Sequence, residues 1–218
     1  MRPITVTVGN QVTAASATAL RTASIVNGPG DLVLDGAQVV NGIGVLEADR
    51  NILLTVVAGT GGRVMIEGVN TAGYPVSESM FVPLGFSGTI QSTMLYRKVF
   101  RASASLAIIS LSIGTVATGT SPWVAFDSWA PSPISIQTSV AGTANYTVQS
   151  TLDNPTDTTS PIYNVPQSAV WINSSDATMV GASTGLQSNF LFAPQFARIL
   201  LNSGTGLVTA TFLQSGAS

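Results

Sequence analysis

The chain has 218 residues, of which eight are Lys or Arg and ten are Asp or Glu, giving a formal net charge of −2. Charged residues make up 8% of the chain, far below the roughly 25% of ordinary soluble domains, so neutral polar side chains must cover most of the surface. Cys and His are both absent, which excludes disulfides and thiolate metal sites and removes the commonest general base and metal ligand.

Alternation of apolar and polar residues predicts β-strands from the start of the chain. In the first half the pattern covers residues 4–8, 31–35, 51–58, 63–69, 74–82, 88–96 and 98–104. Residues 51–58 and 63–69 are predicted to pair across the glycine-rich turn 59–62, and residues 70–73 are predicted to turn into the strand 74–82. Residues 12–25 are rich in Ala and Thr and are expected to hold at most one short turn.

The alternation slips by one residue at Ile108 and Ile109. Because such a slip moves every later side chain to the other face of a strand, a bulge or turn is predicted there.

A small, flexible and uncharged segment at residues 115–120 predicts a boundary between two modules, residues 1–118 and 119–218. Further strands are predicted at 134–140, 144–151, 169–173, 190–192, 196–202 and 207–213. An apolar strand followed by a small residue, Gly and Thr recurs at 52–60, 134–143 and 199–205, which predicts antiparallel hairpins in both halves. The predicted fold class is all-β, with two antiparallel β-sandwich modules in tandem, either Ig-like or jelly-roll-like.

The carboxylates do not form a convincing catalytic pattern. Glu47 and Asp49 are expected in a polar turn beside Arg50, and Asp153 and Asp157 in a solvated loop without the spacing of a calcium site. A serine nucleophile needs an activating base, and the single lysine, Lys98, lies in no recognisable dyad. We therefore predict a non-enzymatic protein with no cofactor, no metal and no small-molecule substrate.

Nucleic acid and membranes are also unfavourable partners. The most basic segment holds Arg97, Lys98 and Arg101, which is more typical of a solvated strand end or a subunit contact than of a phosphate-binding patch. The beginning of the chain alternates and lacks the apolar run of a secretory signal. The long uncharged stretch 102–126 is interrupted by Ser, Thr, Gly and Pro, unlike a membrane span.

Aromatic residues cluster between the predicted modules, at Trp123, Phe126 and Trp129. Three interpretations stay open: a plug at the junction of the modules, an anchor for a neighbouring subunit, because Trp is enriched in interface hot spots, or a platform for carbohydrate.

Residues 36–125 resemble structural proteins encoded by tailed bacteriophages. The resemblance is carried by the strand 52–57, the glycine turn 59–62, the segment Gly68-Val69-Asn70-Thr71-Ala72-Gly73, and the aromatic–basic element Tyr96-Arg97-Lys98-Val99. The second half is similar to the partner module of those proteins at residues 121–124, 140–154 and 197–206, and it departs from them at 155–187.

The resemblance implies a component of the phage particle, made in the host cytoplasm. A capsid decoration or cement protein is our first expectation. Its expected partners are the major capsid protein and further copies of the chain itself, with which it would form a homotrimer. The alternatives are a tail or fibre component that binds the host surface, and a carbohydrate-binding β-sandwich. Ile4, Val6 and Val8 are expected to form an arm that pairs with a neighbour's sheet edge, and Trp123, Phe126 and Trp129 are the other candidate interface residues.

Overall fold

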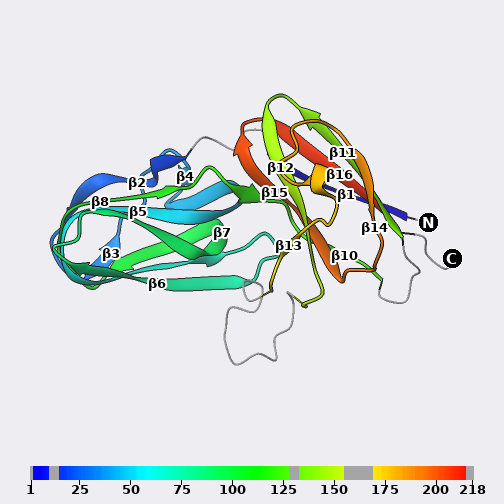
Figure 1. Cartoon of the computed structure of the whole chain (residues 1–218). Coiled ribbons are helices and arrows are strands. Elements are labelled where there is room, and N and C mark those ends of the chain that lie inside the picture. The colour runs from blue at the N-terminus through cyan, green and yellow to red at the C-terminus, as the bar shows by residue number, and fades with distance from the viewer. Residues whose placement is uncertain (1, 10–14, 128–132, 155–168, 215–218) are drawn as a thin grey trace. The chain divides into compact units, whose positions relative to one another are not determined.

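A computed structural model describes residues 2–9, 15–127, 133–154 and 169–214 (Figure 1). Asp157 and Trp129 therefore lie outside the described residues. The elements are β1 (Arg2–Gly9), β2 (Ser16–Val26), β3 (Gly30–Leu32), β4 (Val39–Val40), β5 (Ile43–Val69), β6 (Pro75–Leu84), β7 (Gly88–Ala104), β8 (Ile108–Thr115), β9 (Gly119–Thr120), β10 (Val124–Ala125), β11 (Ile134–Ala141), β12 (Ala144–Thr151), β13 (Ile172–Asn173), the 3-10 turn η1 (Ala177–Met179), β14 (Gln187–Phe190), β15 (Phe196–Gly204) and β16 (Leu207–Gln214). The prediction of an all-β protein with antiparallel sheets is confirmed.

Two compact units divide the chain, and the N-terminal strand belongs to the later one. The N-unit is Ala15–Ala117, and the C-unit combines β1 with the described chain from Thr118 onward. The reason is that β1 pairs with β16 along its whole length, from Arg2 opposite Gln214 to Gly9 opposite Leu207. The predicted modules 1–118 and 119–218 differ from this division at β1, because a change of composition along the chain cannot reveal a strand that pairs with its far end.

Two long strands, β5 and β7, run through both layers of the N-unit (Figure 1). Residues 50–59 of β5 pair with β8 and with the first half of β7. Residues 60–69 pair with β6 and with the second half of β7, to which Gly44 and Val45 also pair. β2 extends the first layer by pairing with β8, and β3 extends the second by pairing with β7. β2 and β3 are therefore edge strands on opposite layers.

The predicted hairpin around residues 59–62 is wrong, because β5 bends there and continues. Its two halves take other partners instead of each other. Ala58 (φ 50°) and Gly61 (φ 85°) have left-handed backbone conformations that turn the strand, and a Cβ on Gly59 would lie 2.7 Å from Val82 Cγ1. Glycine is needed here because the bend brings β5 against β6.

Other local predictions for the N-unit have mixed outcomes. The turn 70–73 is confirmed: the side chain of Asn70 accepts hydrogen bonds from the N–H groups of Ala72 (3.0 Å) and Tyr74 (3.1 Å), and Gly73 has φ 83°. The slip near Ile109 is confirmed as a register shift, since Ser24 and Val26 of β2 pair with Leu111 and Ile108. The segment 12–25, expected to hold only a short turn, instead contains most of β2.

The C-unit contains two sheets. One, which we call the four-stranded sheet, has the order β1-β16-β11-β14. In the other, the β12–β15 sheet, β12 pairs with β13 and β15, and β15 also pairs with β9 and β10. The aromatic rings of Phe126, Phe190 and Phe212 meet in the core of the C-unit. The ring centroids of Phe126 and Phe212 are 5.5 Å apart, and those of the other two pairs are 6.4 Å apart.

The predicted hairpins at 134–143 and 199–205 are also wrong, because each turn crosses from one sheet to the other. β11 and β16 lie in the four-stranded sheet, whereas β12 and β15 pair in the β12–β15 sheet. The buried side chains of consecutive strands consequently face each other, as in the 2.6 Å hydrogen bond between Thr138 Oγ1 and the Tyr146 hydroxyl.

The two crossings stack on each other. The N–H of Gly206 donates to the Thr143 carbonyl at 2.8 Å. A Cβ on Gly204 would lie 2.4 Å from the Thr143 carbonyl oxygen, and Gly142 (φ 83°) and Gly204 (φ 97°) both need left-handed backbone. The two occurrences of the small-Gly-Thr pattern in the C-unit therefore mark a stacked pair of sheet-to-sheet crossings.

Candidate functional site

The first candidate interface, strand β1, lies on its own chain. Val8 is buried, and Ile4 and Val6 are half-buried, so this apolar side of β1 faces the interior of the C-unit. Pro3, Thr5 and Thr7 face outward. In the structure β1 pairs with β16 of the same chain. The expected pairing of Ile4, Val6 and Val8 with the sheet edge of a neighbouring chain stays a prediction, and it would require β1 to detach from β16.

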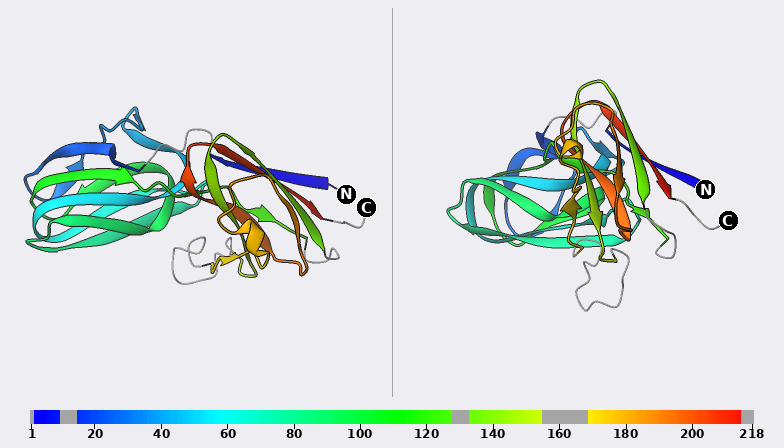
Figure 2. Two further views of the ribbon diagram at one scale, coloured as in Figure 1. Left: turned by 45° about the horizontal axis from the view of Figure 1, so that its top comes forward. Right: turned by 45° about the vertical axis from the view of Figure 1, so that its right-hand side comes forward.

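The outward residues of β1 belong to an uncharged face of the four-stranded sheet (Figure 2 shows β1 in blue beside β16 in red). Register places them in rows across the sheet. The rows are Pro3, Leu213, Ser135 and Asn189; then Thr5, Thr211, Gln137 and Gln187; then Thr7, Thr209 and Ser139. Alternation in each strand puts these side chains outward and the buried ones, such as Val8, Ile136 and Phe212, inward. We call the outward surface the neutral face.

The neutral face carries a shallow hollow and few internal contacts. Thr5 Oγ1 and Thr211 Oγ1 share a hydrogen bond of 3.0 Å. The hollow, of about 320 Å³, is lined by residues that include Pro3, Gln137, Gln187 and Leu213. Hydroxyl and amide groups on a flat strand array can bind a second polar surface through direct or water-mediated hydrogen bonds.

The polar outer side of the β12–β15 sheet is different, because the chain covers it. Asn202 Nδ2 donates to Asn145 Oδ1 (2.8 Å) and Thr147 Oγ1 (3.0 Å), while Thr147 accepts the N–H of Gly181 (3.0 Å) and Asn145 donates to the Gly181 carbonyl (2.6 Å). These polar groups are satisfied within the chain. The outer side of the β12–β15 sheet is therefore covered by the chain itself, whereas the neutral face of the four-stranded sheet is exposed to solvent.

The aromatic cluster predicted from sequence is split by the structure. Phe126 is 9% exposed and packs in the core of the C-unit, while Trp123 is half-buried and Trp129 lies outside the described residues. The ring of Phe126 is thus used for internal packing. An interface role for Trp123 stays a prediction.

Sequence inspection missed Trp171. The Arg198 guanidinium carbon lies 4.2 Å from the Trp171 ring centroid, and Arg198 Nε donates to Gln149 at 3.0 Å. An arginine held over an indole in this way is a cation–π contact. No local pattern reveals it, because the two residues are brought together only by the pairing of β12 with β13 and β15.

The structure places charged residues of the carboxylate pair near Arg50 and of the basic segment within strands. Glu47, Asp49 and Arg50 lie inside β5 and not in the expected turn; Arg50 is fully buried and Asp49 is 3% exposed. Arg101 pairs with Asp31 (2.7 Å) and Glu67 (3.1 Å) on an exposed strand face. The expected turn at residues 47–50 is wrong because these residues lie in an irregular part of β5, where the register to β7 shifts between Val45 and Arg50.

Asp153 has a structural contact as well, because its carboxylate accepts a hydrogen bond from the N–H of Val170 at 2.7 Å. In the described part of the chain, no group of three or more His, Cys, Asp or Glu side chains is arranged to hold a metal ion. Over the same residues, no helix has both the length and the hydropathy of a membrane span.

Comparison with known proteins adds little. No family model matches the sequence, and neither does any curated protein. Among solved structures, the chain is similar to the crystal structure of the PBSX exported protein XepA, at a TM-score of 0.24 and 11% identity, over 95% of this chain and 86% of that one. A TM-score this low does not establish a shared fold.

Proposed function

We propose that this chain is a non-enzymatic structural protein of a tailed-phage particle, and specifically a decoration protein that binds and stabilises the head shell. Its partners would be the major capsid protein and further copies of the chain, assembled as a homotrimer. The sequence resemblance at residues 36–125 and in the second half supports the phage assignment.

The observation that carries the proposal is the neutral face. Its rows consist of Thr, Ser, Gln and Asn side chains together with Pro3 and Leu213, and they contain no charged side chain. Such a surface can be buried against a partner without the free-energy cost of desolvating ions. Its sheet also has free strand edges at β1 and β14 within the described residues, and a free edge can accept a strand from another protein.

Purified particles of the encoding phage give the test. Quantitative mass spectrometry should find the chain in hundreds of copies per particle; a few tens of copies would favour the tail, and absence would refute the proposal. The variant Gln137→Lys, which puts a charge in the middle of the neutral face, should reduce incorporation at least about tenfold, as expected for a buried unpaired charge. Ser77→Lys, on an exposed strand position of the N-unit, is the matched control and should incorporate normally.

Carbohydrate binding is the second candidate, because the hollow on the neutral face presents amide and hydroxyl groups suited to a neutral polyhydroxylated ligand. A glycan array probed with the wild type, Gln137→Ala and Trp123→Ala separates the possibilities. Binding lost in Gln137→Ala would support this function, and an array without any binding would remove it.

A further inference from the structure

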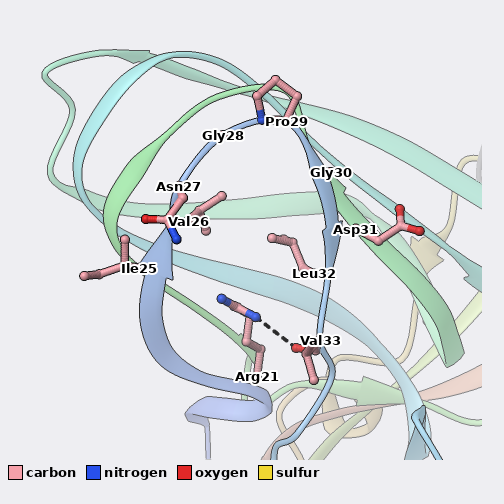
Figure 3. A pocket seen from close by; sticks show the side chains of 10 residues that line it. All are labelled: Arg21, Ile25, Val26, Asn27, Gly28, Pro29, Gly30, Asp31, Leu32 and Val33. Carbon is pink, nitrogen blue, oxygen red and sulfur yellow. Dashed lines mark hydrogen bonds between the residues drawn. The ribbon is translucent and has the colours of Figure 1, made fainter.

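The N-unit has a pocket of about 510 Å³ between its two edge strands (Figure 3). The end of β2 forms one wall and β3 with Val33 forms the other, while the loop Asn27-Gly28-Pro29 closes the top. β2 pairs with β8 and β3 pairs with β7, so these two strands do not pair with each other. The pocket is thus the open side of the unit, between its layers.

Arg21 lies at the base of this pocket with its guanidinium directed between the walls (Figure 3). The residue is 6% exposed. Nη1 donates to the Val33 carbonyl at 3.0 Å and Nη2 donates to Ser24 Oγ at 2.6 Å, while Nε is buried without a hydrogen-bond partner. A guanidinium has five N–H donors, so its capacity is only partly used by these contacts.

The charge of Arg21 is also without a direct counter-ion. The ion pairs formed among the described residues join Arg50 to Glu47 and Arg101 to Asp31 and Glu67, and none includes Arg21. Asp31, at the pocket wall, is engaged by Arg101 at 2.7 Å. Asp35 binds the N–H and hydroxyl of Thr22, each at 2.8 Å. Both nearby carboxylates therefore make their short contacts with other groups, and the charge of Arg21 acts on Asp35 only at longer range, where it adds to the Thr22 hydrogen bonds in lowering the pKa of Asp35.

The walls around this cation combine apolar side chains with polar groups, among them Asn27 and Asp31. Ile25 is 65% exposed and Val33 68%, and Leu32 and Val26 complete the apolar part of the lining. A pocket that places a fixed charged group beside apolar side chains can bind a small amphipathic ligand. A carboxylate is the group that matches a guanidinium in both charge and planar geometry.

We propose that the pocket between β2 and β3 binds a carboxylate carried on a short apolar chain, with Arg21 as the anchor and the apolar part lying against the lining at Val33. The carboxylate can belong to a free organic acid or to an acidic side chain in an extended segment of another protein. The chemistry of recognition is the same for both.

The full-length protein can be titrated with hexanoate and, as a neutral match, with hexanamide, while amide chemical shifts of residues 21–33 are followed by NMR. Hexanoate should bind saturably, and hexanamide at least about tenfold more weakly, because hydrogen bonds to an ionised acceptor are roughly twice as strong as neutral ones. A capped peptide Ala-Val-Glu-Val-Ala and its Gln counterpart form the second arm. Tighter binding of the Glu peptide than of hexanoate identifies a protein segment as the source, and the reverse identifies a free acid.

Variants locate the binding. Arg21→Gln should abolish it and Arg21→Lys should retain part of it. Since Arg21 is buried, Val33→Glu provides a second variant at an exposed position, where a like charge at the mouth should also abolish binding. Val40→Glu, at an exposed strand position (61%) outside the lining, should bind as the wild type. Absence of saturable binding by both hexanoate and the Glu peptide, or undiminished binding in Val33→Glu, would overturn the proposal.

Discussion

The guanidinium of Arg50 connects two parts of the N-unit from inside its core. It donates to the Val116 carbonyl from Nε at 2.8 Å and also from Nη2, and Nη1 lies 3.4 Å from a Glu47 carboxylate oxygen. Burial lowers the pKa of Arg50 and the Glu47 charge raises it in part, but an arginine stays protonated in proteins. The contact therefore fixes the irregular part of β5 to the segment that follows β8.

Replacing Arg50 should destabilise the N-unit selectively. Arg50→Ala removes the donors to the Val116 carbonyl and the cation beside Glu47, which keeps its hydrogen bond from Gln38. The loss should cost about 3 kcal/mol of unfolding free energy. Hydrogen exchange measured by mass spectrometry should show faster exchange across residues 15–117 and unchanged exchange in β11–β16. Arg63→Ala, on an exposed strand face, should change stability by less than about 0.5 kcal/mol; equal effects of the two variants would contradict the role of Arg50.

Two aspartates make stability depend on acid. The pKa of Asp35 is lowered by hydrogen bonds from the N–H and hydroxyl of Thr22, and the pKa of Asp176 is lowered by hydrogen bonds from Ser188 and Thr178. A lowered pKa in the folded state means that the unfolded chain binds protons first as the pH falls. The stabilisation is therefore present above 3.8, the ordinary pKa of an aspartate, and is lost as the pH falls from there through the lowered pKa of the folded state.

We therefore expect the melting temperature to fall as pH is lowered below about 4, with little change between about pH 5 and 8, where no histidine or cysteine is present to titrate. Calorimetry over this range checks the prediction. Asp35→Asn should reduce the acid-dependent loss, and an acid profile identical to that of the wild type would contradict the assignment for Asp35.

The neutral face shows what single residues could and could not reveal from sequence. Thr5 and Thr7 are visibly the polar positions of an alternating strand, so their outward direction could be predicted. Their position beside Thr211, Gln137 and Gln187 could not, because it follows from the pairing of β1 with β16 across almost the entire chain. Arg21 was missed for the same reason, since its burial depends on β2 and β3 being edges of different layers.

At the scale of elements, the turns between strands decide the topology. Alternation correctly indicated strands on both sides of Gly142 and Gly204. However, a strand, a glycine-containing turn and a second strand can form either a hairpin within one sheet or a crossing between two sheets. Which of the two forms depends on the partner of the second strand, and that partner is distant in sequence. The tight contact of the two crossings, with Gly206 bonded to Thr143, is visible only in three dimensions.

Glycine substitutions test the stacked crossings. Gly204→Ala combines a left-handed backbone (φ 97°) with a Cβ placed 2.4 Å from the Thr143 carbonyl oxygen, and should lower unfolding free energy by about 2 to 4 kcal/mol. Gly73→Ala has a similar φ of 83° but nothing within 4 Å of its Cβ, so it should cost only about 1 kcal/mol. Chemical denaturation of the two variants gives the comparison, and equal losses would exclude close stacking at Thr143.

Removal of β1 tests the division into units. Deleting residues 1–8 uncovers the edge of β16 and removes buried Val8, so exchange should accelerate in β16 and β11 although the deletion is at the start of the chain. Protection in β5–β8 should be retained. Faster exchange confined to residues 15–117 would contradict the placement of β1 in the C-unit.

At the scale of the whole molecule, the chain combines scarce charge with exposed apolar groups and a neutral sheet face. Association through such surfaces does not depend on ion pairing. Binding to particles should accordingly change little between about 0.05 and 0.5 M NaCl, a range over which screening weakens surface ion pairs strongly. Co-sedimentation with particles measures this, and release at high salt would indicate an electrostatic interface in place of the neutral face.

The most direct test of the proposed role is a cryo-EM reconstruction of the purified phage particle. The proposal predicts density for this chain on the outside of the head shell, in copies that follow the lattice, with the neutral face of the four-stranded sheet buried against the major capsid protein or another copy. A particle whose head carries no density for the chain, or one in which the neutral face is open to solvent in every copy, would contradict it.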